Sequence, residues 1–299
     1  MIGASPKKFA QPSCRAVWQL INRRLHRVRE QQLETAQRSD SCVPRRSQQS
    51  PPKMACTHPQ RLGNMCAVCG AILTTPSATD VRVGTSATRV ALTVSGAEAA
   101  TVAATRRARL EKRRQLQLVL DLDHTLLECT TDARAAAVRG VEALGDVAGR
   151  PHWVRLRPGL AAFFERVAPL YELAIYTHGS RDYALAVRAR LEAASPGLKF
   201  AGVVSRDCCP DLRGEKSLAR LFPGGAARAL ILDDRLDVWT RGEDQTARVL
   251  VVQPYKFFSA RFRDGDAHRD ADSQLAHSAT ALEAVHERFY AAADAAASA

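Results

Sequence analysis

Two pairs of aspartates in the second half of the sequence could hold a metal ion and act on phosphate. Asp121 and Asp123 end the apolar run LQLVLDLD, and Asp233 and Asp234 end the apolar run ALILDD. Side chains two residues apart on an extended strand leave on the same side. Neighbouring carboxylates repel each other unless a cation neutralises them, and Mg²⁺ takes oxygen ligands while keeping waters that a phosphate can displace. A lone DxD is more often a turn or a strand cap, but the second acidic pair favours a magnesium site.

Five compact apolar runs predict the buried parallel strands that would position these residues. Helical patterns lie between the runs. Alternating strands and helices predict a doubly wound, mostly parallel α/β sheet, in which active sites lie at the carboxyl ends of the strands. Asp121, Thr177 and Asp233 all fall at such ends. The runs are LQLVLDLD (116–123), ELAIYT (172–177), FAGVVS (200–205), ALILDD (229–234) and VLVVQP (249–254), and the helical patterns cover 159–170, 182–193 and 215–222.

The segment LVLDLDHTLLE resembles the nucleophile motif of the haloacid dehalogenase superfamily in its DxDxT phosphatase form. Further segments resemble, in the same order, those of the Fcp-type phosphatases of the RNA polymerase II C-terminal domain: WVRLRPGLAAFF, YELAIYTHGSRDYA, GVVSRD, EKSLARLFP, LILDDRLDVW and VVQPYKFF. The likeness covers roughly residues 115–290. It implies a Rossmann-like sheet, with a small cap or none because the segment between Glu128 and Arg155 is short.

The resemblance implies a Mg²⁺-dependent phosphatase that acts on phosphoserine or phosphothreonine in proteins. Asp121 would attack phosphorus and form an aspartyl-phosphate. Asp123 would protonate the leaving oxygen and then activate the hydrolytic water. Thr177 would donate a hydrogen bond to a phosphoryl oxygen, and Lys216 would hold the same group as a point charge.

The resemblance also implies the metal ligands and the substrate. Mg²⁺ would be held by Asp121, Asp233 and Asp234, and by Asp123 through its backbone carbonyl. Arg157 is open to two interpretations, as a fork-shaped donor to substrate phosphate or as a brace for its loop. A small cap would leave an open cleft that suits a peptide better than a metabolite. The implied substrate is the phosphorylated C-terminal domain of RNA polymerase II, and the implied location is the nucleus.

A second group of metal-binding residue types lies near the start of the sequence. Cys56, His58, Cys66 and Cys69 form two closely spaced pairs within CTHPQRLGNMCAVCG, which resembles a Cys/His segment of some Fcp-type members. Thiolates and imidazoles at such spacings can enclose Zn²⁺. The gap between the two pairs is shorter than in most zinc fingers, so a small reduced turn without metal remains the alternative.

Charge and composition divide the chain into four predicted parts. Residues 1–114 contain 20 Lys and Arg against 6 Asp and Glu, whereas residues 115–299 contain 23 against 25. We predict a disordered basic segment over 1–53, the Cys/His segment over 54–75, a linker and basic helix over 76–114, and the phosphatase domain over 115–299. The basic third suggests an acidic protein or nucleic acid as partner, or a solvated tail.

Two other functions fit parts of the sequence. An Arg-rich start without acidic residues before Glu30 resembles a mitochondrial transit peptide, and a non-catalytic Fcp-like subunit of a mitochondrial translocase would fit it. Both aspartates of the motif are present, which argues against loss of activity. A small-molecule phosphatase of the same superfamily is disfavoured by the short cap segment. The sequence holds no apolar run long enough to span a bilayer, and its eight scattered cysteines fit a reducing compartment.

Overall fold

The computed structural model describes residues 56–74, 77–83, 92–208, 214–239, 245–258 and 272–297. All of them belong to one structural unit that begins at Ala55. The basic segment 1–53, for which the sequence predicts disorder, lies outside the described residues. Within the described ranges, no helix combines the length and the apolar character needed to cross a membrane.

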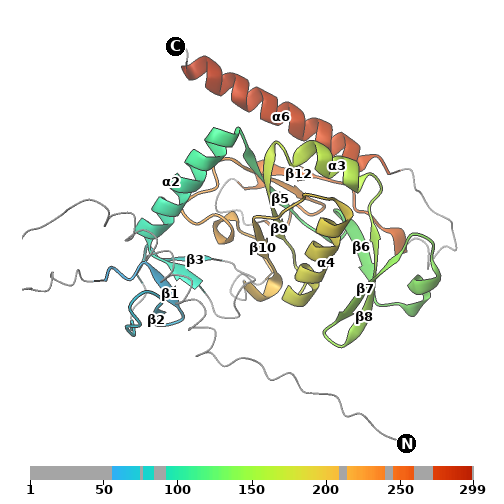
Figure 1. The fold of residues 1–299 in the computed structure, drawn as a ribbon, viewed down its shortest axis with the longest axis horizontal. Coiled ribbons are helices and arrows are strands. Elements are labelled where there is room, and N and C mark those ends of the chain that lie inside the picture. The colour runs from blue at the N-terminus through green and yellow to red at the C-terminus, as the bar shows by residue number, and fades with distance from the viewer. Residues whose placement is uncertain are drawn as a thin grey trace, which may run out of the picture. The chain divides into compact units, whose positions relative to one another are not determined.

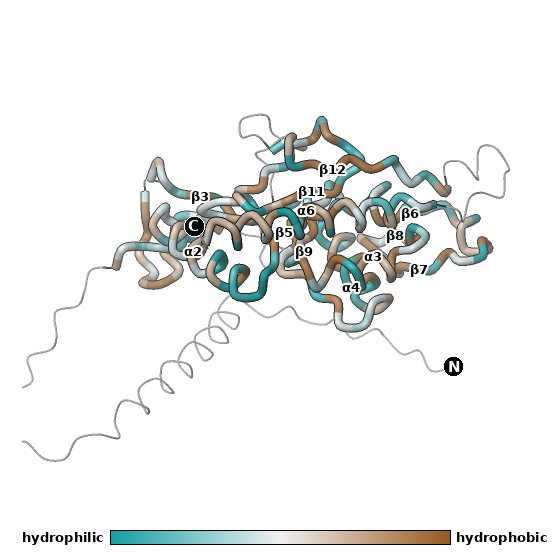
Figure 2. The backbone as a smooth tube through the Cα atoms, turned by 90° about the horizontal axis from the view of Figure 1, so that it is seen from above, coloured by the Kyte–Doolittle hydropathy of each residue, from teal (hydrophilic) through white to brown (hydrophobic). Residues whose placement is uncertain are grey.

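A five-stranded parallel sheet forms the centre of the fold (Figure 1). The strand order is β10-β9-β5-β11-β12, so β5 lies in the middle and pairs with β9 and β11. Every residue of β5 is buried, as expected for the central strand of a parallel sheet. Figure 2 shows that the strands of this sheet are largely hydrophobic. The predicted doubly wound α/β fold is confirmed; its strands are β5 (Leu116–Leu120), β9 (Tyr171–Tyr176), β10 (Gly202–Val204), β11 (Ala229–Asp233) and β12 (Val249–Val251).

Three helices flank the sheet, namely α3 (Leu160–Val167), α4 (Arg181–Ala194) and α6 (Gln274–Ala297). The hydroxyl of Ser180 caps α4 by accepting a hydrogen bond from the Tyr183 backbone N–H. The prediction of a helix over residues 215–222 is wrong, because only the short 3₁₀ helix η4 (Leu218–Arg220) forms there. The backbone N–H of Lys216 donates to Val238, which holds the start of the segment extended. Pro223 disfavours helix at the residue before it.

A three-stranded antiparallel sheet follows β5 in the chain. It contains β6 (Leu127–Thr130), β7 (Glu142–Val147) and β8 (Arg150–Leu156), with β8 in the middle. Ala148 and Gly149 have φ values of 54° and 81° and form the tight turn of the β7–β8 hairpin, since a two-residue turn of this kind needs positive φ at both positions. The small cap expected between Glu128 and Arg155 is this sheet.

The segment predicted to be a linker contains regular structure. Strands β3 (Val81–Val83) and β4 (Leu92–Val94) pair with β1 (Gln60–Leu62) and β2 (Met65–Cys66) in a four-stranded antiparallel sheet ordered β2-β1-β4-β3. The basic helix α2 spans Gly96–Arg113 and is capped by Ser95, which accepts from the backbone N–H of Glu98. The periodicity of these short strands is weak, and they depend on their partners: β4 pairs with β1, which is distant in the chain, and β3 pairs with β4. The domain boundaries at residues 75 and 114 stay predictions.

Candidate active site

Asp121 follows the central strand β5 directly and lies in a buried ion-pair network. Its Oδ1 atom lies 2.7 Å from the Nζ atom of Lys216, which also lies 2.7 Å from Oδ2 of Asp233. The Lys216 side chain is only 1% exposed. Burial alone lowers the pKa of Lys216, but Asp121 and Asp233 outweigh this effect and raise it, so the ammonium group stays charged.

Two aromatic rings enclose the Lys216 ammonium. The ring centres of Tyr176 and Trp239 lie 5.9 and 5.5 Å from Nζ. The indole N–H of Trp239 donates to Oδ2 of Asp233 at 3.1 Å. The hydroxyl of Tyr176 accepts from the backbone N–H of Ser217, next to the lysine. These contacts fix both the cation and one of its carboxylate partners.

The three carboxylates at the ends of β5 and β11 fit a divalent cation. One oxygen from each of Asp121, Asp233 and Asp234 lies within 4.8 Å of the others. Burial raises the pKa values of Asp233 and Asp234; the charge of Asp121 adds to the rise at Asp233, and that of Asp233 to the rise at Asp234. Lys216 neutralises one of the three negative charges, so two remain, and a hard divalent ion with oxygen ligands would balance them.

Asp123 lies apart from this carboxylate cluster and has a different partner. The hydroxyl of Tyr183, on α4, donates a hydrogen bond to Oδ1 of Asp123. Burial raises the pKa of Asp123 to about 6, and the charge of Asp121 adds to the rise, whereas the bond from Tyr183 opposes it. The side chain of Asp123 is not among the grouped metal-ligand atoms. The resemblance to Fcp-type phosphatases implies that Asp123 binds metal through its backbone carbonyl. This role stays a prediction.

Thr177 follows β9, the neighbour of β5, and is 1% exposed. Its backbone N–H donates to the carbonyl of Val204, and its Oγ1 atom accepts from the backbone N–H of Gly179 at 2.9 Å. The hydroxyl proton of Thr177 can therefore point elsewhere, as a phosphate-binding role requires. This role stays a prediction.

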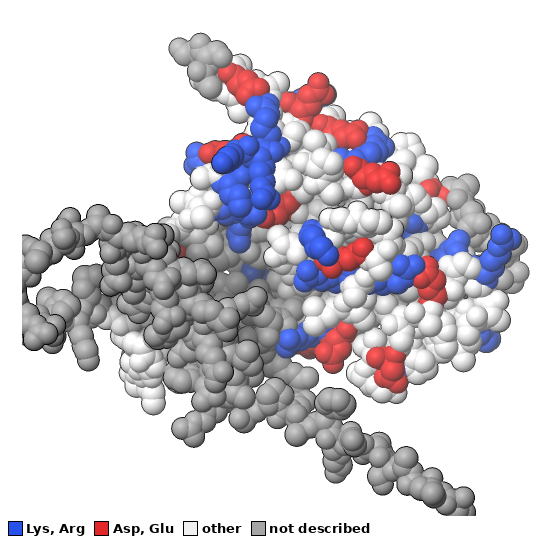
Figure 3. All heavy atoms as spheres, viewed as in Figure 1, with Lys and Arg blue, Asp and Glu red and all other residues white. Residues whose placement is uncertain are grey.

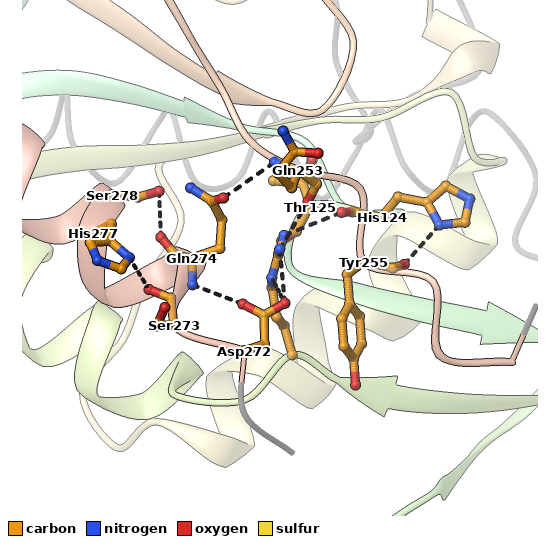
Figure 4. A network of polar contacts seen from close by, with 10 residues as sticks. His124, Thr125, Gln253, Tyr255, Asp272, Ser273, Gln274, His277 and Ser278 are labelled. Carbon is orange, nitrogen blue, oxygen red and sulfur yellow. Dashed lines mark hydrogen bonds and ion pairs between the residues drawn. The ribbon is translucent and has the colours of Figure 1, made fainter. Parts of the chain in front are cut away.

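Arg157 is buried among protein acceptors. Figure 4 shows these acceptors, which are His124, Thr125, Gln253 and Asp272, gathered in one polar network. Its Nε atom lies 3.0 Å from Oδ2 of Asp272, and its Nη2 atom donates to the carbonyl of Gln253 at 2.8 Å. Its Nη1 atom donates to the carbonyls of Thr125 and His124 at 2.9 and 3.4 Å. These contacts join the turn after Asp123 to the segment that leads to α6, which supports the bracing interpretation of Arg157. Its role stays a prediction.

Sequence reasoning did not single out Tyr183 or Trp239 as site residues. Tyr183 lies in a helical pattern, where an aromatic residue is normally part of the core, and its partner Asp123 is 60 positions away. Trp239 belongs to the segment LILDDRLDVW, which resembles a segment of the Fcp-type phosphatases. This resemblance is the sequence signal that could have identified Trp239 as a site residue. The sequence does not show which carboxylate an indole N–H will reach.

A cleft of about 750 Å³ opens beside Asp123. Its walls come from the three-stranded sheet, from the turn before α4 and from Arg206. Arg150, His152 and Arg206 provide basic groups, and Thr131 and Ser180 provide hydroxyls. The cleft is open to solvent and polar, so a phosphorylated chain segment could enter it.

The four Cys and His residues near the start lie together. Sγ of Cys56 lies 3.9 Å from Sγ of Cys66, and Sγ of Cys69 lies 3.4 Å from Nδ1 of His58. One ligand atom from each of the four lies within 4.8 Å of the others. The predicted cluster is therefore present, and its donor set of three thiols and one imidazole suits tetrahedral Zn²⁺.

A parallel sheet with aspartates after the ends of β5 and β11, joined by a buried lysine, defines an α/β domain with a candidate metal and phosphate site. The family model described as NLI interacting factor-like phosphatase matches residues 116–289. The chain belongs to this family, and the resemblance to Fcp-type phosphatases is confirmed.

Several relatives are named as phosphatases of the C-terminal domain of RNA polymerase II. A C-terminal domain phosphatase of RNA polymerase II from Schizosaccharomyces pombe is 33% identical over 226 residues, which cover 68% of this chain and 30% of that protein. The Homo sapiens protein of the same name is 32% identical and covers 68% of this chain, which spans 22% of it. The solved structure of Fcp1, described as an essential RNA polymerase II CTD phosphatase, matches with a TM-score of 0.53 at 26% identity, covering 63% of this chain and 67% of that one.

Proposed function

We propose that this chain removes phosphate from phosphoserine or phosphothreonine in a protein, through an aspartyl-phosphate on Asp121. The observation that supports this most is the contrast between two carboxylates two residues apart. Asp121 pairs with the Lys216 ammonium, whereas Asp123 accepts a hydrogen bond from Tyr183 and has a pKa that burial raises to about 6. When two neighbouring carboxylates have such different surroundings, one is suited to act as a nucleophile and the other as a general acid and base.

In the first step an oxygen of Asp121 forms a bond to phosphorus as the bond to the serine or threonine oxygen breaks. Asp123 donates its proton to that leaving oxygen. In the second step water attacks the phosphorus of the aspartyl-phosphate, Asp123 takes the proton of the water, and the Asp121 carboxylate is released with phosphate. Lys216 compensates the negative charge on the attacking carboxylate and on the phosphoryl oxygens. Thr177 would donate its hydroxyl proton to one of those oxygens.

We propose Mg²⁺ as the cofactor, held by Asp121, Asp233 and Asp234. The excess negative charge of this cluster and the raised pKa values of Asp233 and Asp234 support the assignment. When bound, the ion would neutralise phosphoryl oxygens and reduce their repulsion from the carboxylates.

We propose the phosphorylated C-terminal domain of RNA polymerase II as substrate, and the nucleus as location. The names of the relatives support both, and the open cleft with basic groups beside Asp123 supports the substrate. The chain spans less than half of the length of these relatives.

The test is turnover of a panel of phosphopeptides and sugar phosphates by the full chain, with Mg²⁺ or with EDTA. We expect release of phosphate from phosphoserine or phosphothreonine peptides that requires Mg²⁺, and far slower release from sugar phosphates. Preference for sugar phosphates would favour a small-molecule phosphatase. Binding of peptides without turnover of any substrate would favour a non-catalytic binding protein and contradict the proposal.

For the cluster of Cys56, His58, Cys66 and Cys69 we propose a structural zinc site. The closeness of the four ligand atoms supports it. Elemental analysis of reduced, purified protein should find close to one zinc per chain. Cys66→Ser should lower that content, and the matched control Cys208→Ser, outside the cluster, should not. Absence of zinc in the parent protein would contradict the proposed site and favour a reduced turn without metal in this segment.

A further inference from the structure

A second cavity lies at the opposite end of the central sheet from the aspartates. Its volume is about 840 Å³, and it is lined by one side of α2, the start of β5, the segment 224–228 and Phe289. Gln117 in its wall comes four residues before Asp121 on the same strand, which separates the two sites by about 13 Å along β5. The cavity is therefore distinct from the proposed active site.

Three buried N–H donors in this cavity have no acceptor. Nη1 of Arg106, Nε2 of Gln117 and Nη1 of Arg228 are buried and make no hydrogen bond within the described residues. All three residues line the cavity, and Gln117 is only 3% exposed. An unpaired buried donor costs about 1–3 kcal/mol, so three in one cavity point to a ligand that offers several acceptor oxygens.

Neighbouring groups fix the orientation of both guanidinium groups. Arg106 packs over the ring of Phe222 at 5.2 Å, and Arg228 packs over the ring of Phe289 at 5.4 Å. The other edge of Arg228 donates through Nη2 to Glu111. Each guanidinium therefore lies over an aromatic ring and keeps one buried Nη1 without a protein acceptor, and an oxyanion is the acceptor that a guanidinium favours.

The charge of the cavity wall favours an anion. Arg106, Arg107 and Arg228 line it against a single carboxylate, Glu111, so the lining has an excess of positive charge. Figure 3 shows Lys and Arg side chains gathered over α2. Glu172 approaches Arg106 at 4.0 Å but is also paired with Arg109, which offsets its charge.

The wall is rigid where α2 meets the segment 224–228. A Cβ atom added to Gly224 would lie 2.2 Å from the carbonyl oxygen of Ala99, so only glycine allows this close approach. The remaining lining is mostly alanine from α2. The cavity is also much larger than a single oxyanion and falls in the range of ligand pockets, about 300–1,000 Å³.

We propose that this cavity binds a phosphate group through Arg106, Gln117 and Arg228, and that the group belongs to a phosphorylated peptide side chain. The three donors would hold the phosphate oxygens, while the alanine-rich wall would contact the rest of the peptide. Free inorganic phosphate offers the same acceptor oxygens and is the other source of this chemistry. The cavity would bind its ligand whether or not Asp121 is catalytic.

The test is calorimetric titration of the full chain in EDTA with inorganic phosphate and with a phosphoserine peptide, at constant ionic strength. We expect the peptide to bind at this cavity, and Gln117→Leu and Arg228→Gln each to weaken that binding at least tenfold. Arg113→Gln is the matched control, since it removes one charge from the exposed side of α2 without touching the cavity. The amide signals of the Gln117 side chain should shift on titration in a nuclear magnetic resonance spectrum of the parent protein.

The possible outcomes separate the alternatives. Equal affinity in Arg228→Gln and Arg113→Gln, with unshifted Gln117 amide signals, would overturn the proposal and leave a water-filled cavity. Binding of inorganic phosphate alone would contradict the peptide source. Arg228→Gln should keep the parent turnover of a short phosphopeptide, so a loss of binding without loss of turnover also excludes simple misfolding.

Discussion

At the scale of single residues, the site depends on how the surroundings of two aspartates differ. Asp121 and Asp123 have the same side chain and leave the same strand end, yet one faces the Lys216 ammonium and the other a tyrosine hydroxyl. The sequence predicts the pair and its separation, because DxD after an apolar strand is a local pattern. It does not predict the partner from α4, because that contact depends on how the helix packs.

We predict that Asp121→Asn abolishes turnover and that Asp123→Asn reduces it by more than about a hundredfold. In the proposed mechanism the first change removes the nucleophile and the second removes the group that transfers the proton. Rates on a phosphoserine peptide with Mg²⁺ measure both. Asp294→Asn, an exposed change on α6, is the matched control. Substantial Mg²⁺-dependent turnover by folded Asp121→Asn would contradict the mechanism.

We predict that Tyr183→Phe shifts the pH profile of kcat/KM upward. The hydroxyl donates to the charged form of Asp123 and so lowers its pKa; without it the pKa rises above about 6, and Asp123 keeps its proton to higher pH. A hydrogen bond to a charged group contributes about 1.5–3 kcal/mol, so the alkaline limb should move by about one pH unit or more. Tyr290→Phe, which loses a bond to a backbone carbonyl instead, should leave the profile unchanged.

At the scale of elements, the five strands of the parallel sheet were predictable because each is a short apolar run that ends in a polar residue. The failures have a common cause. The segment 215–222 has a helical pattern but is held extended where Lys216 pairs with Trp239. Strand β4 has a weak pattern and forms through pairing with β1, and β3 then pairs with β4. In both cases a partner distant in sequence determines the local conformation.

The elements around the site are joined by Arg157, and its replacement should reduce stability. We predict that Arg157→Ala lowers the free energy of unfolding by about 3–5 kcal/mol, because it leaves Asp272 and buried carbonyls without their donor. Urea unfolding measures this loss. Arg134→Ala, a change at an exposed arginine, should stay within about 0.5 kcal/mol of the parent. An unchanged stability together with a raised KM would instead favour direct contact of Arg157 with substrate phosphate.

At the scale of the whole molecule, charge is distributed unevenly along the chain. Residues 1–53 contain 11 Lys and Arg against 3 Asp and Glu, whereas the segment from residue 115 onward is close to neutral. A basic segment of this kind can attract a multiply phosphorylated substrate, and the attraction is screened by salt. Binding of nucleic acid by the same segment stays a prediction.

We predict that removing residues 1–53 leaves kcat on a short phosphopeptide nearly unchanged. The same deletion should raise KM on a long, multiply phosphorylated peptide, most clearly at low ionic strength. Steady-state kinetics at two salt concentrations measure the difference. Equal KM values for both proteins on the long peptide at low salt would contradict steering by charge. A mature chain that begins after residue 30, found by mass spectrometry, would favour import or internal initiation.

The position of β5 in the middle of the sheet has a consequence for the synthesis of the protein. Leu118 pairs with Leu173 on one side and with Leu230 on the other, so the second edge of β5 waits for a strand about 110 residues further along the chain. At a ribosomal rate of about 5–20 residues per second, that wait lasts roughly 6–22 s. Throughout this interval the nascent chain has an open apolar strand edge, a template for aggregation. Lys216 and Asp233 follow Asp121 by 95 and 112 residues, so the site assembles only once most of the domain has left the ribosome.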